Sequence, residues 1–75
     1  MAGKIKTAFP SIKQALGNGT ITRYYNEVDR FNRTRVHFFV KYKKPIVIGA
    51  PWSITGEWYV CSEKYWKSSV SSHLR

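Results

Sequence analysis

The sequence has few of the residues on which extracellular folds and membrane proteins are built. It contains a single cysteine, Cys61, so no disulfide can form within the chain, whereas small secreted domains usually carry several. We therefore expect an intracellular protein, either cytoplasmic or associated with the nucleoid or nucleus. The longest nearly apolar run, residues 45–52, is well short of the ~20 residues that span a bilayer, which predicts no membrane partner.

Residues suited to catalysis or metal binding are also scarce. The chain has four carboxylates, and Glu27 and Asp29 lie close to Arg23 and Arg30, which favours salt bridging over acid–base chemistry. One cysteine and two histidines without CxxC or HxxxH spacing fall short of the four ligands of a structural zinc site. No glycine-rich phosphate loop is present. We therefore expect no enzyme, no catalytic residue, no metal and no cofactor.

Positive charge, in contrast, is abundant. Thirteen Lys and Arg against four Asp and Glu give a net charge of +9. The charge is uneven, because residues 1–44 carry a net +8 and residues 45–75 only +1. A charge of about +2 to +8 keeps many small domains soluble without any partner. A field of one sign over more than half of the chain favours an anionic partner, because it concentrates such partners and speeds encounter.

The length and the aromatic content predict one folded domain, residues 1–75. The chain is too short for a second core, and its 12 aromatic residues provide the bulky side chains that a small core needs. Ser11 and Gln14 have the spacing of a capping box, apolar residues follow at helical spacing, and Gly17 is a typical stop signal. These signals predict a short helix over residues 11–16.

The middle of the chain has the patterns of strands. Residues 34–42 alternate between apolar and largely basic side chains, which predicts a strand with one basic face. Residues 43–45 are typical of a connection, with Pro45 opening a second strand over residues 45–49. Residues 53–56 are typical of a turn before a third strand over residues 57–61.

Two other segments are less clear. Residues 20–31 have apolar side chains at helical spacing but the composition of a strand after the Asn18-Gly19 turn, so helix and strand both stay open. Residues 63–73 have the spacing of a possible C-terminal helix, weakened by serines. The predicted fold class is α+β, a small antiparallel sheet of three to four strands with one or two helices.

Basic residues are interleaved with aromatic ones in three segments, residues 23–25, 35–39 and 41–44. Basic side chains neutralise phosphates, and exposed aromatic rings stack on unpaired bases. We therefore expect a small non-enzymatic nucleic-acid-binding protein, with either DNA or RNA as its partner. The residues expected to bind nucleic acid are Arg23, Arg30, Arg33, Arg35, Lys41, Lys43, Lys44 and Phe39, and Tyr25 and Tyr59 are further candidates for stacking, although most aromatics of so small a chain belong to the core.

Residues 12–25 resemble a helix-turn-helix, with a first helix that ends at Gly17 and a turn two residues shorter than usual. The resemblance implies a second helix in the major groove of duplex DNA and a basic wing over residues 34–48. The side chains that would face the groove are Thr22, Arg23 and Asn26.

A second hypothesis is a small interaction or inhibitor protein that docks the same basic, aromatic face on an acidic protein partner. Tyr, Trp and Arg dominate the energetics of such interfaces. The sequence leaves the oligomeric state open under both hypotheses.

Overall fold

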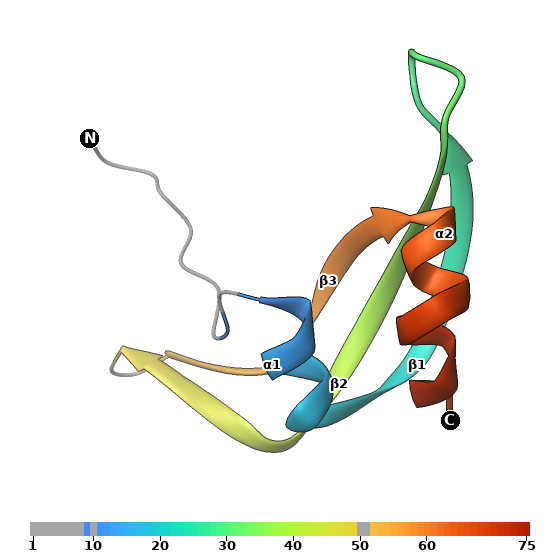
Figure 1. Ribbon diagram of the computed structural model, residues 1–75. Coiled ribbons are helices and arrows are strands. Elements are labelled where there is room, and N and C mark those ends of the chain that lie inside the picture. The colour runs from blue at the N-terminus through green and yellow to red at the C-terminus, as the bar shows by residue number, and fades with distance from the viewer. Residues whose placement is uncertain (1–8, 10, 50–51) are drawn as a thin grey trace.

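The computed structural model describes residues 9, 11–49 and 52–75 (Figure 1). Its centre is a three-stranded antiparallel sheet in the order β1-β2-β3, formed by β1 (Gly19–Val28), β2 (Thr34–Gly49) and β3 (Trp52–Ser62). A short helix, α1 (Ile12–Gly17), precedes the sheet. The chain ends in a helical segment made of α2 (Glu63–Tyr65), the π-helical η1 (Trp66–Val70) and the 3-10 turn η2 (Ser71–His73). The predicted α+β class, with a small antiparallel sheet, is confirmed.

Helix α1 lies within one residue of the predicted range at each end, with Ser11 as its N-cap and Gly17 as its last residue. The Ser11 side chain accepts a hydrogen bond from the backbone N–H of Gln14 at 3.2 Å, which satisfies one of the free donors of the first turn. At the other end the Asn18 side chain donates to the carbonyl of Gln14 at 3.0 Å. Ala15 and Leu16 are buried against the sheet, so the helix is held by packing on one side and by caps at both ends.

Strand β1 settles the segment that the sequence left open. Its pairing with β2 shifts between Ile21 and Arg23, so Thr22 forms a bulge. One extra residue reverses the side of every residue that follows. Ile21 therefore faces the helices, whereas Arg23 and Tyr25 face the other side, and the irregular alternation is explained. The helix-turn-helix interpretation of residues 12–25 is wrong, because a strand occupies the place of the second helix.

Two predicted breaks in the sheet do not occur. Residues 34–42 and 45–49 are one bent strand, β2, and residues 53–56 belong to β3 instead of forming a turn. Pro45 is tolerated because it lies in a gap in both ladders. Pairing with β1 ends at Tyr42, and pairing with β3 skips from Lys41 to Ile46, so the missing N–H of proline leaves no ladder bond unmade.

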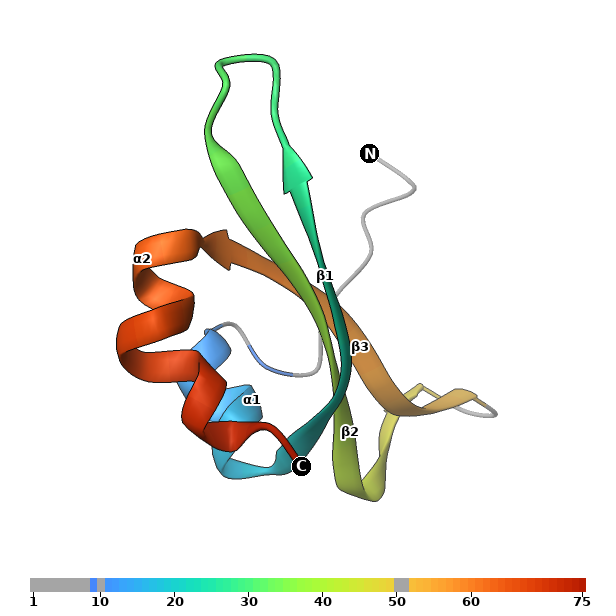
Figure 2. The same cartoon turned by 90° about the vertical axis from the view of Figure 1, so that its right-hand side faces the viewer.

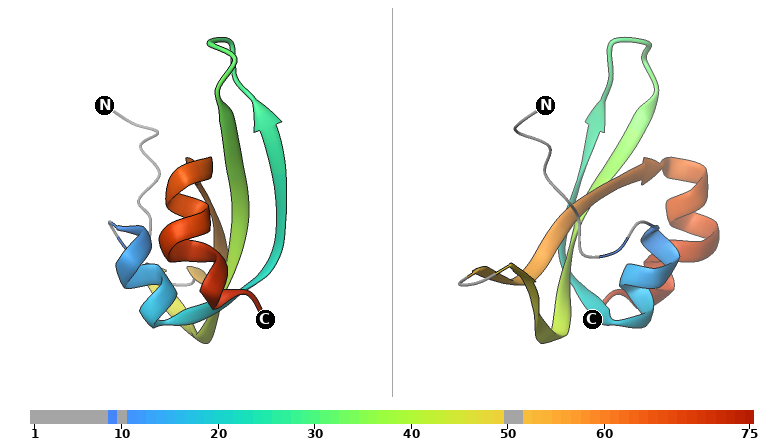
Figure 3. Two further views of the ribbon diagram at one scale, coloured as in Figure 1. Left: turned by 45° about the vertical axis from the view of Figure 1, so that its right-hand side comes forward. Right: turned by 90° about the vertical axis from the view of Figure 1, so that its left-hand side faces the viewer.

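The helices lie on one face of the sheet, which makes a two-layer structure (Figures 2 and 3). Between the layers, Val36, Phe38 and Val40 of β2 are at most 1% exposed and form the centre of the core with Ile21 and Val70. The predicted C-terminal helix over residues 63–73 is confirmed as a helical segment. Its end is tied to the edge of the sheet, because the backbone N–H of Arg75 donates to the carbonyl of Ile21 at 3.1 Å.

A polar cluster of Tyr42, Glu57 and Tyr59 lies at the helix-covered face. The Tyr42 hydroxyl bonds to both other side chains, and the Tyr59 hydroxyl donates to Glu57 at 3.0 Å. Burial raises the pKa of both tyrosines above its usual value. Tyr59, one of the candidates for stacking, is instead packed against the core, as expected of most aromatics in so small a chain. Among the helices of the described residues, none is long and apolar enough to cross a membrane.

Candidate nucleic-acid interface

The face of the sheet that points away from the helices is covered by no described helix or strand (Figure 3). Strand alternation places on this face every second residue of each strand, counted after the bulge in β1. We call it the open face. Its side chains are Arg23, Tyr25 and Glu27 of β1, Arg35, His37, Phe39 and Lys41 of β2, and Trp58 and Val60 of β3.

Three aromatic rings from three different strands meet at the middle of the open face. Trp58 makes edge-to-face contacts with Tyr25 and Phe39, at centroid distances of 5.6 and 5.5 Å. Tyr25 also stacks on His37 at 4.8 Å with the ring planes 4° apart. Tyr25 is 51% and Trp58 47% exposed, so the cluster is ordered by mutual contact while a large part of its ring surface remains in water.

Gly56 of β3 sets the position of the Phe39 ring. A Cβ atom at residue 56 would come within 2.5 Å of Cζ of Phe39 and 2.6 Å of the carbonyl oxygen of Val40. The ring therefore lies flat against the backbone at a place where only glycine leaves room for it. This contact keeps Phe39 half-buried and leaves Trp58 as the more exposed partner.

Two basic residues of the open face have no acidic partner in the described part of the chain. The Arg23 guanidinium lies 5.5 Å from the Phe39 ring centroid and 5.6 Å from that of Trp58, within the range of a cation–π contact. Lys41 is exposed on the same face. Charge and rings are therefore interleaved at the end of the open face away from the β1–β2 hairpin.

The basic residues nearer the hairpin are partly neutralised. Asp29 lies 3.2 Å from Arg35 and 3.4 Å from Arg33, and Glu27 lies 2.7 Å from His37. The pKa of Asp29 is lowered, first by the hydrogen bond from the backbone N–H of Arg33 and further by Phe31 and Arg35, which keeps the carboxylate charged. This end of the open face is less positive than the end with Arg23.

The structure distributes the predicted site residues over three places. Arg23, Arg35, Phe39 and Lys41 come together on the open face. Arg30 and Arg33 lie in the β1–β2 hairpin. Lys43 and Lys44 lie past the bend of β2, where they line a hollow of about 320 Å³ with Asn18 and Ile46.

Sequence reasoning missed Trp58. The alternation over residues 57–61 separates Trp58 and Val60 from Tyr59 and Cys61, but both sides are largely apolar, so the pattern does not say which side faces the helices. A signal was available in Gly56 directly before this run, since a glycine in a strand often marks a place where another group approaches closely.

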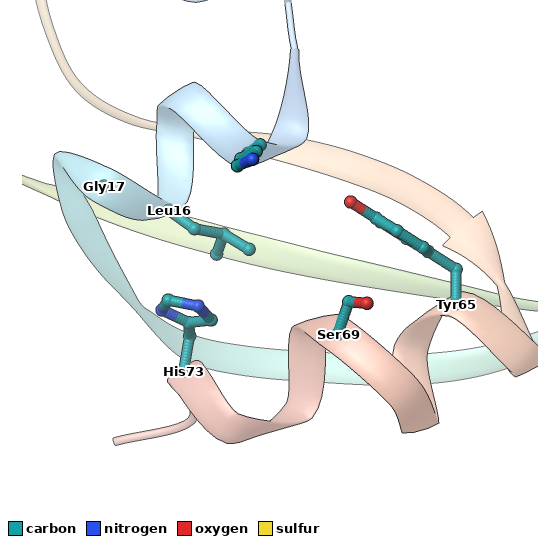
Figure 4. Close-up of a pocket in the computed structure, with 6 residues that line it drawn as sticks. Leu16, Gly17, Tyr65, Ser69 and His73 are labelled. Carbon is teal, nitrogen blue, oxygen red and sulfur yellow. The ribbon is translucent and has the colours of Figure 1, made fainter.

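A second concave surface lies between α1 and the C-terminal helical segment. It has a volume of about 390 Å³ and is lined by Lys13, Leu16, Gly17, Tyr65, Ser69 and His73 (Figure 4). Small-molecule sites place a few polar groups in fixed positions in an enclosed pocket. Here the polar side chains of the lining, Lys13, Tyr65, Ser69 and His73, are all exposed, so this cleft has no preorganised group to select a ligand.

The described residues contain no group of three or more His, Cys, Asp or Glu that could hold a metal ion. Cys61 is buried beneath the C-terminal helical segment, and burial raises the pKa of its thiol.

The open face thus gathers aromatic rings and unpaired cations in one place. No family model matches the chain, and neither the curated proteins nor the solved structures contain a significant match to it.

Proposed function

We propose that the protein is a non-enzymatic module that binds single-stranded nucleic acid, DNA or RNA, on its open face. The observation that carries the proposal is the cluster of Tyr25, Phe39 and Trp58 on an uncovered sheet, with the Arg23 guanidinium over two of the rings. Unpaired bases stack on aromatic rings for about 1–3 kcal/mol each, and the neighbouring cations would contact the phosphates between them.

A single strand suits this surface better than a duplex. In a duplex the planes of the bases are stacked on one another and only their edges reach a protein, so exposed rings have nothing to stack on. The described residues also place no recognition helix near the basic segment, because β1 replaces the helix that a major-groove reader needs. An uncovered sheet face with aromatic rings at its middle and unpaired cations beside them matches splayed bases along an extended backbone.

Basic residues without an ion pair also support a nucleic acid as the partner. Five of the predicted basic residues form no ion pair within the described residues, namely Arg23, Arg30, Lys41, Lys43 and Lys44. Arg23 and Lys41 lie on the open face, and if both contact a phosphate the slope of log K against log salt is near −1.4 for a single strand, whereas contacts from all five would bring it near −3.5.

The test compares a labelled single strand with the matching duplex by fluorescence anisotropy over a range of salt concentrations. Trp58→Ala and Tyr25→Ala should each weaken single-strand binding by at least about fivefold, the loss of one stacked base. Tyr24→Ala is a matched control, because Tyr24 is the neighbour of Tyr25 in the same strand, is 50% exposed and faces the other way, against Trp66.

Three outcomes contradict the proposal. The first is no binding of either strand at low salt, and the second is a binding constant that salt does not change. The third is an equal loss on Tyr24→Ala and Tyr25→Ala, which would mean that the open face has no special part in binding.

A protein partner is the second candidate, favoured by the juxtaposition of Tyr25, Trp58 and Arg23, the residue types that dominate interface hot spots. Capture of one acidic protein that survives nuclease treatment and is lost on Trp58→Ala would support it. Loss of the captured protein on nuclease treatment would return the assignment to nucleic acid.

A further inference from the structure

The tip of the β1–β2 hairpin, residues 29–33, presents an aromatic ring to solvent. Phe31 is 67% exposed, more than Tyr25 or Trp58 on the open face. The Arg33 guanidinium lies 5.0 Å from the centroid of its ring and is held there by Asp29 at 3.4 Å. One side of the ring therefore carries a cation, and no other ring contact or cation–π contact of Phe31 occurs within the described residues.

The turn that carries Phe31 is closed by four hydrogen bonds. The Asp29 carboxylate accepts hydrogen bonds from the backbone N–H groups of Phe31 and Arg33 at 2.8 and 3.0 Å. Two backbone bonds close the turn, from the N–H of Asp29 to the carbonyl of Arg33 and from the N–H of Asn32 to the carbonyl of Asp29. Asn32 has φ of 61°, a left-handed conformation that asparagine tolerates. A preordered turn loses little conformational entropy when a ligand binds to it.

The hairpin tip continues the strands that form the open face. β1 and β2 stay paired up to Val28 and Thr34, and the hairpin projects beyond both helices (Figures 1 and 3). Strand β1 runs three residues from Tyr25 to Val28, about 10 Å at about 3.4 Å per residue, and the tip lies beyond that point. A strand that lies along the open face can therefore reach the tip.

We infer that the hairpin tip is a second contact site for the single strand that the open face binds. Phe31 stacks on one base, on the side of the ring that Arg33 does not cover, and Arg30 and Arg33 contact the flanking phosphates. A ring paired with a guanidinium provides a stacking plane and a phosphate contact in one unit. This inference rests on the proposed function and extends the site from the open face to the end of the hairpin.

The experiment uses the full isotope-labelled chain with oligothymidylates of two lengths, about 4 and about 12 nucleotides, near the two ends of the range that one small domain covers. The short strand should shift the backbone amide signals of the open face alone, whereas the long strand should also shift those of Phe31 and Arg33. Phe31→Ala should weaken binding of the long strand by at least about fivefold and leave the short strand unchanged. Phe31→Trp should bind the long strand as well as the wild type does.

Val47→Ala is the control, because Val47 is 73% exposed and lies towards the end of the opposite hairpin. The inference is overturned if Phe31→Ala leaves binding of the long strand unchanged, or weakens it no more than Val47→Ala does. It is also overturned if Phe31→Ala weakens both strands equally, because the loss would then not come from a distal contact. In these cases the wild type still binds, and the proposed function stands. If the wild type binds neither strand, the proposed function fails and this inference fails with it.

Discussion

Replacing Gly56 with alanine tests the packing that positions the aromatic cluster, and it needs no ligand. The added Cβ would lie 2.5 Å from the Phe39 ring and 2.6 Å from the carbonyl oxygen of Val40, whereas carbon atoms in contact are about 3.5–4.0 Å apart. The ring must swing away by about 1 Å or more, and the β2 backbone cannot move without opening the ladder.

Such overpacking costs about 1–3 kcal/mol, and the smaller entropy of the unfolded alanine chain offsets about 0.4–1 kcal/mol of it. A net loss of about 1–2 kcal/mol in the free energy of unfolding is expected. In a domain of this size each kcal/mol corresponds to about 4–8 °C in Tm, so thermal unfolding followed by circular dichroism should show a fall of about 5–15 °C. The variant should also bind single strands more weakly, because Phe39 and Trp58 lose their present arrangement.

Gly17→Ala is the matched control, since a Cβ at Gly17 would have no atom of the described residues within 4 Å apart from its chain neighbours and the backbone of its own helix. It should leave the Tm unchanged or raise it. In a double-mutant cycle, Phe39→Ala removes the ring that Gly56→Ala would displace, so the two losses should not add, with a coupling of about 0.5 kcal/mol or more. A Tm of Gly56→Ala equal to that of Gly17→Ala, or strict additivity in the cycle, would refute the account of the cluster.

Three further predictions concern the core, the hairpin and the thiol. Phe38→Ala removes a fully buried ring and should lower the free energy of unfolding by about 3–5 kcal/mol. A urea titration at 25 °C should show that much of the variant is unfolded even before urea is added. The pKa of Asp29 is lower in the folded than in the unfolded protein, so the stability that its carboxylate contributes is present above about pH 4 and is lost as the pH falls. Asp29→Asn should therefore flatten the decline of Tm between about pH 5 and pH 2. Parallel curves of Tm against pH for the wild type and the variant would refute this role. Cys61 should react slowly with a thiol reagent at neutral pH and quickly in denaturant, because burial raises its pKa and blocks access.

Local signals in the sequence predicted the elements whose causes are local. The Ser11 cap and the stop at Gly17 located α1, and the clean alternation over residues 34–42 located the central part of β2. The strand at residues 20–28 could not be recognised because of the bulge at Thr22. A bulge shifts the alternation of apolar and polar residues, and no particular residue type marks its position. Pro45 led to the prediction of two separate strands, but β2 is continuous through it, because neither neighbouring strand pairs with β2 at that residue.

The candidate site could be predicted only in part for a similar reason. Phe39 and Lys41 stood out because residues 34–42 alternate between apolar and largely basic side chains, and Arg23 stood out because Tyr24 and Tyr25 follow it. Trp58 did not, because β3 is apolar on both sides and only the tertiary packing decides which side the helices cover. The ion pairs of Asp29 with Arg33 and Arg35 also depend on the closing of a hairpin, so the less positive end of the open face could not be separated from the more positive end.

The exposed aromatic rings follow from the architecture and at the same time require an explanation. A 75-residue chain with helices on one face of a sheet has only one core, and the described residues offer no second layer for the open face. Burial stabilises a protein by roughly 25 cal/mol for each Å² of apolar surface removed from water, and rings that stay exposed do not contribute this stabilisation. Polar residues would suit an uncovered face at no such loss. Gly56 seats the Phe39 ring, and the Arg23 guanidinium lies over Phe39 and Trp58, so the structure specifies an exposed cluster that core formation does not require. This is the arrangement expected if the proposed single strand stacks on the open face.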